Sequence, residues 1–220
     1  MSSAIVQLIV LAGVAIFLIL RLRGVLGTRE GFEKPVVPVA ADPALRNRRG
    51  LEVIEGGVDA DITDHVALGT PAAKALAEMK SVEPGFSVTD FLRGARSAYE
   101  LILTAFDKGE LDKILPLLSP DVYESFVQVV EDRETKGLTV QSTFVGISEL
   151  ALVSVEFDRS TSEAEVTIRF VAEMYSAVRN TAGEIVEGNP NLIKHQKDVW
   201  TFARRMGVEN PNWQLVATGE

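Results

Sequence analysis

The first charged side chain of this chain is Arg21, and the segment before it is almost wholly apolar. Residues 5–20 (IVQLIVLAGVAIFLIL) have only Gln7 and Gly13 as exceptions. At a rise of about 1.5 Å per residue, residues 2–20 make a helix about 28 Å long, close to the roughly 30 Å of hydrocarbon in a bilayer. A buried core helix would show polar residues at 3.6-residue spacing, and this segment shows none. The segment therefore predicts one membrane-spanning helix.

Three arginines follow this segment directly, at Arg21, Arg23 and Arg29. A cleaved signal peptide carries its positive charges before the apolar run and a small-residue cleavage site after it, so we expect this segment to stay attached. Lys and Arg beside a span are retained on the cytoplasmic side. Residues 1–27 are thus expected to anchor the chain in the lipid bilayer, with the N-terminus outside and the remainder inside.

Composition separates a linker from a folded domain. Residues 28–69 hold three prolines and no sustained apolar period, which predicts a flexible linker, and residues 70–220 are long enough for one domain with a hydrophobic core. The chain has no cysteine, so disulfides, thiolate zinc sites and a cysteine nucleophile are excluded. The net charge of −9 lies in residues 81–220, where thirteen Lys and Arg face twenty-two Asp and Glu. Such a surface repels phosphate backbones, so no nucleic-acid partner is expected.

Two short motifs lie inside the expected linker. The basic cluster RNRRG at residues 46–50 suits either contact with anionic headgroups or simple solvation, and the sequence leaves both open. The acidic motif DADITDH at residues 59–65 lacks the glycine and the distal glutamate of a calcium loop. We therefore predict no metal site there.

Three helices are predicted from their caps and apolar spacing. Thr70-Pro71 begins a short helix that Glu83-Pro84-Gly85 stops, and Ser87 begins a long helix that ends at Lys108-Gly109. The long helix carries a capping box at its start, because Asp90 follows Ser87 by three residues. After a short turn, Ser119-Pro120 begins a third helix, closed by Lys136-Gly137.

Beyond Gly137 the apolar period changes from helical to alternating. Residues 166–174 alternate apolar and polar side chains, which predicts a strand, and residues 150–156 form another strand before it. Turn residues leave 194–204 and 213–218 as two further strands. Strands joined by short loops pair antiparallel. The sequence therefore predicts an α+β domain whose helices cover one face of a long, curved antiparallel sheet.

Four separated blocks carry a resemblance to a known family. They are residues 91–126 (FLRGARSAYELILTAFDKGELDKILPLLSPDVYESF), residues 143–147, residues 168–170, and DVWTFAR…NPNWQLVATGE from Asp198 onward. In this order they resemble the C-terminal domain of the mitochondrial inner-membrane translocase subunit 44 family, the Tim44-like domain, over residues 86–220.

The resemblance implies a fold and a role. The implied fold is a cone related to nuclear transport factor 2, with helices against a strongly bent sheet and an apolar pocket between them. In mitochondria such proteins sit on the inner membrane and recruit a heat-shock chaperone to the import channel. The segment GTREGFEKP at residues 27–35 is similar to short membrane-anchored bacterial members.

The chain departs from the mitochondrial pattern in two ways. Its first arginine follows the apolar segment, so we expect no Arg-rich transit peptide. About forty proline-containing residues stand where the mitochondrial proteins have a long charged half. These differences favour a single-pass protein of the bacterial inner membrane with a cytoplasmic domain, and they leave chaperone recruitment open.

The sequence offers candidates for a pocket and none for catalysis. Neither histidine, His65 or His195, lies in a nucleophile–histidine–carboxylate motif, so no catalytic residue, metal or cofactor is predicted. The pocket candidates are apolar residues at inward positions of the long helix, the third helix and the strands: Phe91, Tyr99, Phe106, Phe126, Phe170, Ala172, Trp200 and Trp213. The aromatic residues among them are more simply explained as core residues.

Three functions follow from these observations. The first is a membrane-tethered adaptor or scaffold that binds a protein partner, such as a chaperone, a translocase or another membrane complex, in translocation or folding. The second is a module that binds lipid or another small apolar ligand. The third is an enzyme on the same cone fold, for which Tyr99, Tyr123 and Tyr175 are the candidate acid–base groups.

Overall fold

The computed structural model describes residues 59–219. The predicted anchor, its flanking residues Arg21, Arg23 and Arg29, and the linker up to residue 58 lie outside these residues. None of the helices between residues 59 and 219 has the length and apolar character needed to cross a bilayer. In chain order the elements are α2 (Ala60–Thr63), α3 (Pro71–Val82), α4 (Val88–Lys108), two 3₁₀ turns (Leu111–Lys113 and Leu115–Leu117), α5 (Pro120–Thr135), β1 (Thr139–Asp158), β2 (Glu163–Arg179), β3 (Ile185–Arg205) and β4 (Gln214–Gly219).

The three predicted helices begin at the predicted caps. The side-chain oxygens of Thr70, Ser87 and Ser119 each accept a hydrogen bond from the backbone N–H three residues later. Such caps satisfy backbone donors that have no partner within the helix. Gly109 ends α4 in the left-handed conformation, with φ of 72°, where glycine carries no Cβ penalty.

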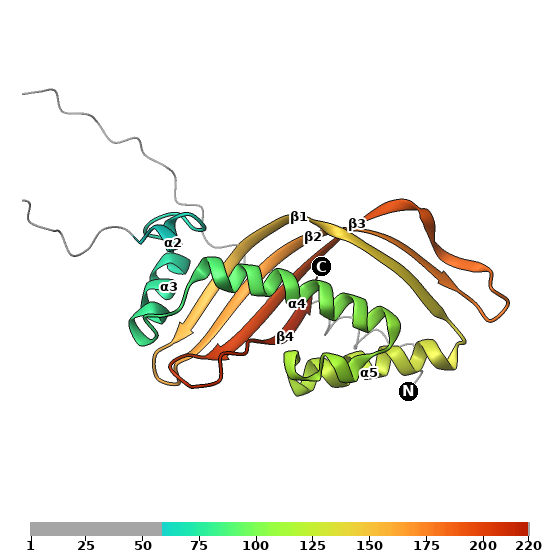
Figure 1. The fold of residues 1–220 in the computed structure, drawn as a ribbon. Helices are drawn as coiled ribbons and strands as arrows, with labels where there is room; N and C mark the ends of the chain where they lie inside the picture. The colour runs from blue at the N-terminus through green and yellow to red at the C-terminus, as the bar shows by residue number, and fades with distance from the viewer. Residues whose placement is uncertain (1–58, 220) are drawn as a thin grey trace, which may run out of the picture. The chain divides into compact units, whose positions relative to one another are not determined.

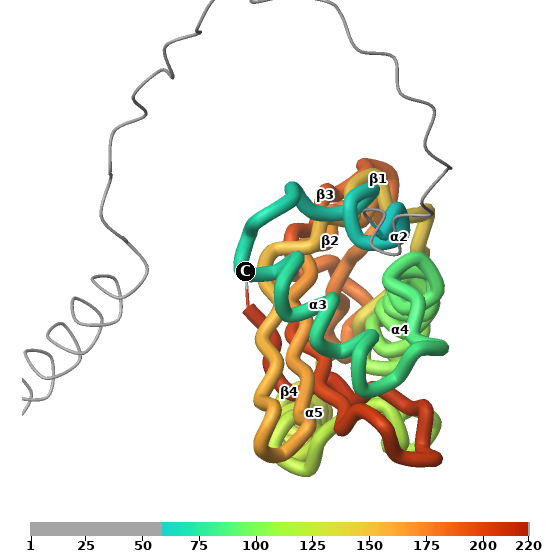
Figure 2. The backbone as a smooth tube through the Cα atoms, turned by 90° about the vertical axis from the view of Figure 1, so that its left-hand side faces the viewer, coloured from blue at the N-terminus to red at the C-terminus, as the bar shows by residue number. Residues whose placement is uncertain are grey.

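The four strands form one antiparallel sheet in the order β1-β2-β3-β4. The predicted α+β class with a curved antiparallel sheet is confirmed. In Figure 1 the strands arch over α4, which runs along the concave side of the sheet. The view turned by 90° shows α4 beside the strands and α5 next to β4 (Figure 2).

The strands are longer than predicted. Where their pairing is irregular, buried and exposed positions do not alternate regularly, so the apolar pattern in the sequence does not show how far each strand extends. The β1–β2 pairing shifts register after Phe144, Ile147 and Leu152, and the β2–β3 pairing shifts after Met174. An extra residue at a bulge moves later side chains to the other face and bends the strand. The same irregularities that hide the strand ends therefore help to curve the sheet around α4.

The stretch at residues 59–69, expected to belong to the linker, is part of the folded structure. Ile62 of α2 is buried in the core. The carboxylate of Asp61 accepts hydrogen bonds from the backbone N–H groups of Val88 at 2.7 Å and Thr89 at 2.9 Å, at the start of α4. Composition alone misses this contact, because the group that Asp61 caps lies 27 residues away in the chain.

Lys80 forms ion pairs with the acidic motif at residues 59–65. Its Nζ lies 2.6 Å from Oδ2 of Asp59 and 2.8 Å from Oδ2 of Asp61. Burial acts to raise the pKa of Asp61, but the hydrogen bonds from Lys80 and from the start of α4 outweigh it and hold that pKa well below its usual range. The acidic motif therefore joins α2 to Lys80 of α3 through ion pairs and to the start of α4 through helix-capping hydrogen bonds.

Candidate binding groove

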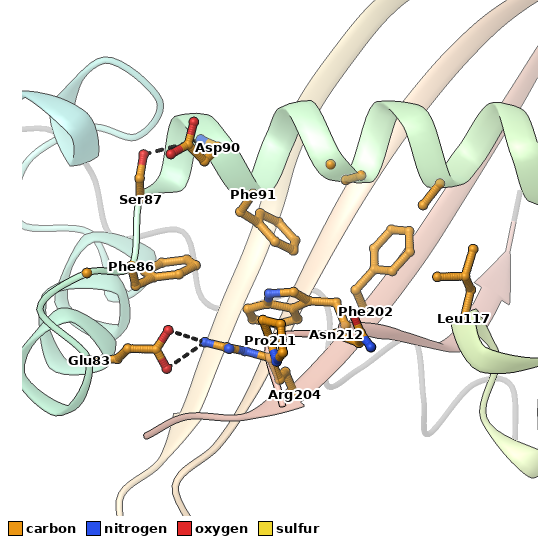
Figure 3. A pocket seen from close by; sticks show the side chains of 15 residues that line it. Glu83, Phe86, Ser87, Asp90, Phe91, Leu117, Phe202, Arg204, Pro211 and Asn212 are labelled. Atoms are coloured by element: carbon orange, nitrogen blue, oxygen red, sulfur yellow. Dashed lines mark hydrogen bonds and ion pairs between the residues drawn. The ribbon is translucent and has the colours of Figure 1, made fainter. Parts of the chain in front are cut away.

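A groove with a volume of about 370 Å³ opens beside the first half of α4. The turn before α4, the last residues of β3 and the loop before β4 form its other walls. Figure 3 shows Phe91 and Phe202 directed into the space between α4 and β3, with Phe86 at one side and Leu117 at the other. The groove is thus assembled mainly from residues 83–98 and 202–213, two segments that lie more than 100 residues apart in the sequence.

Aromatic side chains make up the apolar surface of the groove. The rings of Phe91 and Trp213 are 4.5 Å apart between centroids, and Phe86 lies 6.1 Å from Trp213. Phe202 meets Phe91 edge to face at 6.3 Å. Phe91 and Phe202 are buried, whereas Trp213 is only half-buried. Such a cluster suits an apolar ligand, because the rings pack against one another and remain partly accessible to a ligand.

The helical wall of the groove consists of small residues. Gly94, Ala95 and Ala98 follow Phe91 on the same face of α4. A Cβ atom added to Gly94 would have no atom within 4 Å, so packing does not explain the glycine. Glycine inside a helix costs roughly 1 kcal/mol relative to alanine. Its presence here keeps the wall of the groove open.

An ion pair closes one end of the groove (Figure 3). Nη2 of Arg204 donates to both carboxylate oxygens of Glu83 at 2.7 Å, and the backbone N–H of Gly207 donates to Glu83 at 3.0 Å. Burial acts to raise the pKa of Glu83, but the hydrogen bonds from Arg204 and Gly207 outweigh it and hold the pKa below its ordinary value. The guanidinium carbon lies 5.4 Å from the ring centroid of Trp213.

Arg204 has hydrogen-bonding capacity to spare. Its side chain is 6 % exposed, and within residues 59–219 its Nε has no hydrogen-bond partner. A buried donor without a partner is rare in folded proteins. The groove therefore combines an aromatic surface, a small-residue wall and one fixed cation, an arrangement suited to binding.

The structure distributes the predicted pocket residues over three places. Phe91 and Trp213 line the groove. Phe106 and Phe126 pack against each other at 4.4 Å, near the end of α4. The remaining four candidates lie in the core, almost without exposure: Tyr99, Phe170, Ala172 and Trp200. The structure thus places these eight residues in separate environments, and a role in ligand contact stays a prediction for each.

Tyr99 has a clear packing role. Its ring stacks on Phe170 at 4.4 Å and its hydroxyl donates to Oδ2 of Asp198 at 2.5 Å. Burial and the Asp198 carboxylate raise the pKa of Tyr99, so the hydroxyl stays protonated and remains a donor. The other candidate acid–base tyrosines, Tyr123 and Tyr175, are half-buried on α5 and β2.

The two histidines lie in ordinary surroundings. Nε2 of His65 is 3.0 Å from Oγ1 of Thr89, and Nδ1 of the exposed His195 is 3.8 Å from Glu173. In the part of the chain from 59 to 219, no group of three or more His, Asp or Glu side chains is arranged to hold a metal ion.

Sequence reasoning missed the residues that define the groove most sharply. Glu83 served only as a helix stop, and Arg204 reads as an outward polar residue of a strand. Gly94 carried a usable signal, because it interrupts the strongest helix of the chain without a cap or turn to explain it. Phe86 joins the groove through contacts that no local pattern reveals.

The fold is an α+β domain, and its groove is a candidate binding site. The sequence model of the Tim44-like domain matches residues 72–220, and the chain belongs to this family. The resemblance seen in the sequence is therefore confirmed.

Several known proteins are similar to this chain. Human mitochondrial import inner membrane translocase subunit TIM44 is 26% identical over 151 residues, which cover 67% of this chain and 33% of that protein. TIM44-1 of Arabidopsis thaliana is 25% identical over 195 residues, 84% of this chain and 40% of the relative. The large ribosomal subunit protein mL45 of Drosophila melanogaster is 23% identical over 141 residues, 64% of this chain and 39% of the relative. The chain spans about a third to two fifths of the length of these relatives.

One solved structure is also similar to this chain. The crystal structure of the intermembrane space region of chloroplast protein ARC6 has a TM-score of 0.40 and 12% identity, and the match covers 58% of this chain and 94% of that one.

Proposed function

We propose that this chain is an adaptor tethered to an inner membrane, and that its groove binds an apolar segment of a protein partner during protein translocation. The names of the TIM44 relatives supply the process and the membrane. The groove supplies the chemistry, because its aromatic rings and small-residue wall suit an apolar polypeptide segment. The observation that carries the proposal is Gly94, which leaves an otherwise packed helix face open to a guest.

The proposal includes the organisation of the chain. Residues 1–27 anchor it, residues 28–58 form the tether, and residues 59–220 form the binding domain. The tether raises the local concentration of the domain at the membrane, without contacting the partner. The partner is a chaperone, a translocase or another membrane complex, and the host membrane is a bacterial inner membrane.

Photo-crosslinking in native membranes tests the groove as a protein site. A photoreactive residue in place of the exposed Asp90, at the groove rim, should crosslink the full-length chain to a polypeptide. The same residue in place of Glu100, which is exposed on α4 outside the groove, should not. Gly94→Leu places a large side chain in the groove and should abolish the crosslink from position 90. Ser97→Leu introduces the same side chain on an exposed part of α4 and should leave that crosslink unchanged.

A lipid ligand is the second candidate, and the ion pair at the end of the groove favours it. The unpartnered Nε of Arg204 lies beside an apolar surface, an arrangement that the neutral ester head of a lipid with an acyl chain would fit. Mass spectra of the crosslinked products separate the two. Adducts of lipid alone at Asp90, with no polypeptide after delipidation, would contradict the adaptor proposal and support the lipid one.

The proposed topology has its own test. A reporter fused after Glu220 should be active only if it functions in the cytoplasm, because Arg21, Arg23 and Arg29 follow the apolar segment. Activity of a reporter that works only outside the cytoplasm would overturn the topology and the compartment together.

A further inference from the structure

A second cavity lies at the other end of α4. It has a volume of about 370 Å³ and is enclosed by the end of α4, one face of α5 and the start of β1. It shares no lining residue with the groove. Aliphatic side chains of Val130, Leu138 and Val140 form part of its wall, and the charged residues Asp107 and Arg133 form another part.

Two buried polar atoms of this cavity have no partner. Oδ2 of Asp107 and Nε of Arg133 are both buried, and neither makes a hydrogen bond within residues 59–219. One is an acceptor and the other a donor, and they belong to residues that line the same cavity. Buried polar atoms without partners are costly and uncommon, so a pair of them in one cavity calls for an explanation.

Arg133 is held in place independently of Asp107. Its Nη2 donates to the backbone oxygen of Phe106 at 3.1 Å, and its guanidinium carbon lies 4.4 Å above the ring of Phe106. Within the described residues no salt bridge joins Arg133 to Asp107. The guanidinium is thus fixed by the end of α4, and its Nε–H remains available.

The charges around the cavity indicate a neutral ligand. Its lining contains two acidic residues, Asp107 and Glu134, and two basic residues, Lys108 and Arg133. Burial raises the pKa of Asp107, against the opposing effects of the Ser142 hydroxyl and of the Arg133 and Lys194 charges. A cation or an anion would meet one matching and one opposing group, whereas a neutral molecule with both a donor and an acceptor matches both.

We propose that this cavity binds a small ligand or side chain with a carboxamide head and an apolar body. The amide N–H donates to Oδ2 of Asp107, and the amide oxygen accepts from Nε of Arg133. The body lies against the aliphatic wall. The site is separate from the groove and does not depend on the proposed function of the groove.

Two probes of equal shape test the site. Benzamide carries the carboxamide head, and acetophenone replaces its NH₂ by CH₃ and keeps the carbonyl and the ring. The full-length chain in lipid nanodiscs, labelled at Val and Leu methyl groups, is titrated with each probe by NMR. Methyl signals of Val130, Leu138 and Val140 should shift on titration with benzamide, and that of Leu117 in the groove should not. Benzamide should bind about tenfold more tightly than acetophenone or better, as expected for a hydrogen bond to a charged group.

Three variants complete the test. Asp107→Leu removes the acceptor of the amide N–H and should bring benzamide down to the affinity of acetophenone. Arg133→Lys removes the Nε–H donor while keeping the charge, and it should weaken the binding of both probes, because both carry the carbonyl. Asp132→Leu, on an exposed residue of α5 outside the cavity, should leave the preference for benzamide unchanged. A thermal melt of each variant checks that the fold is retained.

Equal binding of the two probes to the folded wild-type chain would overturn the proposal. So would a preference for benzamide that survives Asp107→Leu, or an Arg133→Lys variant that binds both probes as tightly as the wild-type chain does.

Discussion

The two halves of α4 use one amphipathic face in different ways. The first half presents Gly94 and Ala98 to an open groove. The second half buries Tyr99, Ile102 and Leu103, each at most 7% exposed, under the arch of the sheet. The second half of the helix therefore packs into the core, while the first half buries Val88 but also leaves apolar surface open to a guest. Apolar periodicity along a helix therefore does not by itself distinguish core residues from residues of a binding surface.

The largest effect should come from the packed half. Tyr99→Ala removes a ring that stacks on Phe170 and a hydroxyl that donates to Asp198, so we expect a loss of about 3–5 kcal/mol in the free energy of unfolding. Chemical denaturation of the full-length chain measures it. A loss below about 1 kcal/mol would contradict the contrast between the two halves of α4, since the second half would then contribute little to the core.

The next effect concerns the ionic end of the groove. Glu83→Gln leaves the buried Arg204 without its counter-charge and should cost about 2 kcal/mol. Glu78→Gln, which breaks an exposed ion pair with Arg159, is the control and should cost clearly less, because solvent screens that pair. Equal losses in the two variants would show that Arg204 is better solvated than its burial indicates.

A smaller effect is expected at the start of α4. Asp61→Asn should destabilise the chain by about 1–2 kcal/mol at neutral pH, because the charged cap on Val88 and Thr89 is weakened. The pKa of Asp61 is lowered in the folded state, so its contribution is fully present above the unfolded pKa and is lost as pH falls toward the folded pKa. The wild-type chain should therefore lose more stability in acid than Asp61→Asn does. Parallel acid titrations of the two would contradict this.

The smallest effect has the opposite sign. Gly94→Ala adds a methyl group into open space and removes a helical glycine, so it should stabilise the chain by about 0.5–1 kcal/mol. Thermal unfolding beside wild type measures the gain. A destabilised Gly94→Ala variant would show that the open half of α4 is packed more tightly than described.

The sequence predicted local structure better than assembly. The caps at Thr70, Ser87 and Ser119 and the glycine end of α4 follow from contacts within a few residues, and all of them were predictable. Asp61 was misplaced in the linker because it caps a helix 27 residues later. Strand ends were missed where bulges shift the register, as after Phe144 and Met174.

The groove was predictable only in part. Phe91 and Trp213 are large apolar residues whose candidacy follows from periodicity and composition. The same reasoning selected Tyr99 and Trp200, which are buried, because pattern does not show where a curved sheet pulls away from a helix. The Glu83–Arg204 pair joins residues 121 positions apart, and no local signal connects them.

The two tryptophans report on the two regions, so one measurement tests the central claim. The full-length chain labelled with 5-fluorotryptophan is titrated with the polypeptide recovered by crosslinking at Asp90, and ¹⁹F NMR follows Trp213 in the groove and Trp200 in the core. If the groove binds this polypeptide, we expect a saturable shift of the Trp213 signal, little change at Trp200, and no shift of either signal in Gly94→Leu. A shift of Trp200 as large as that of Trp213, or a shift of Trp213 that persists in Gly94→Leu, would contradict it.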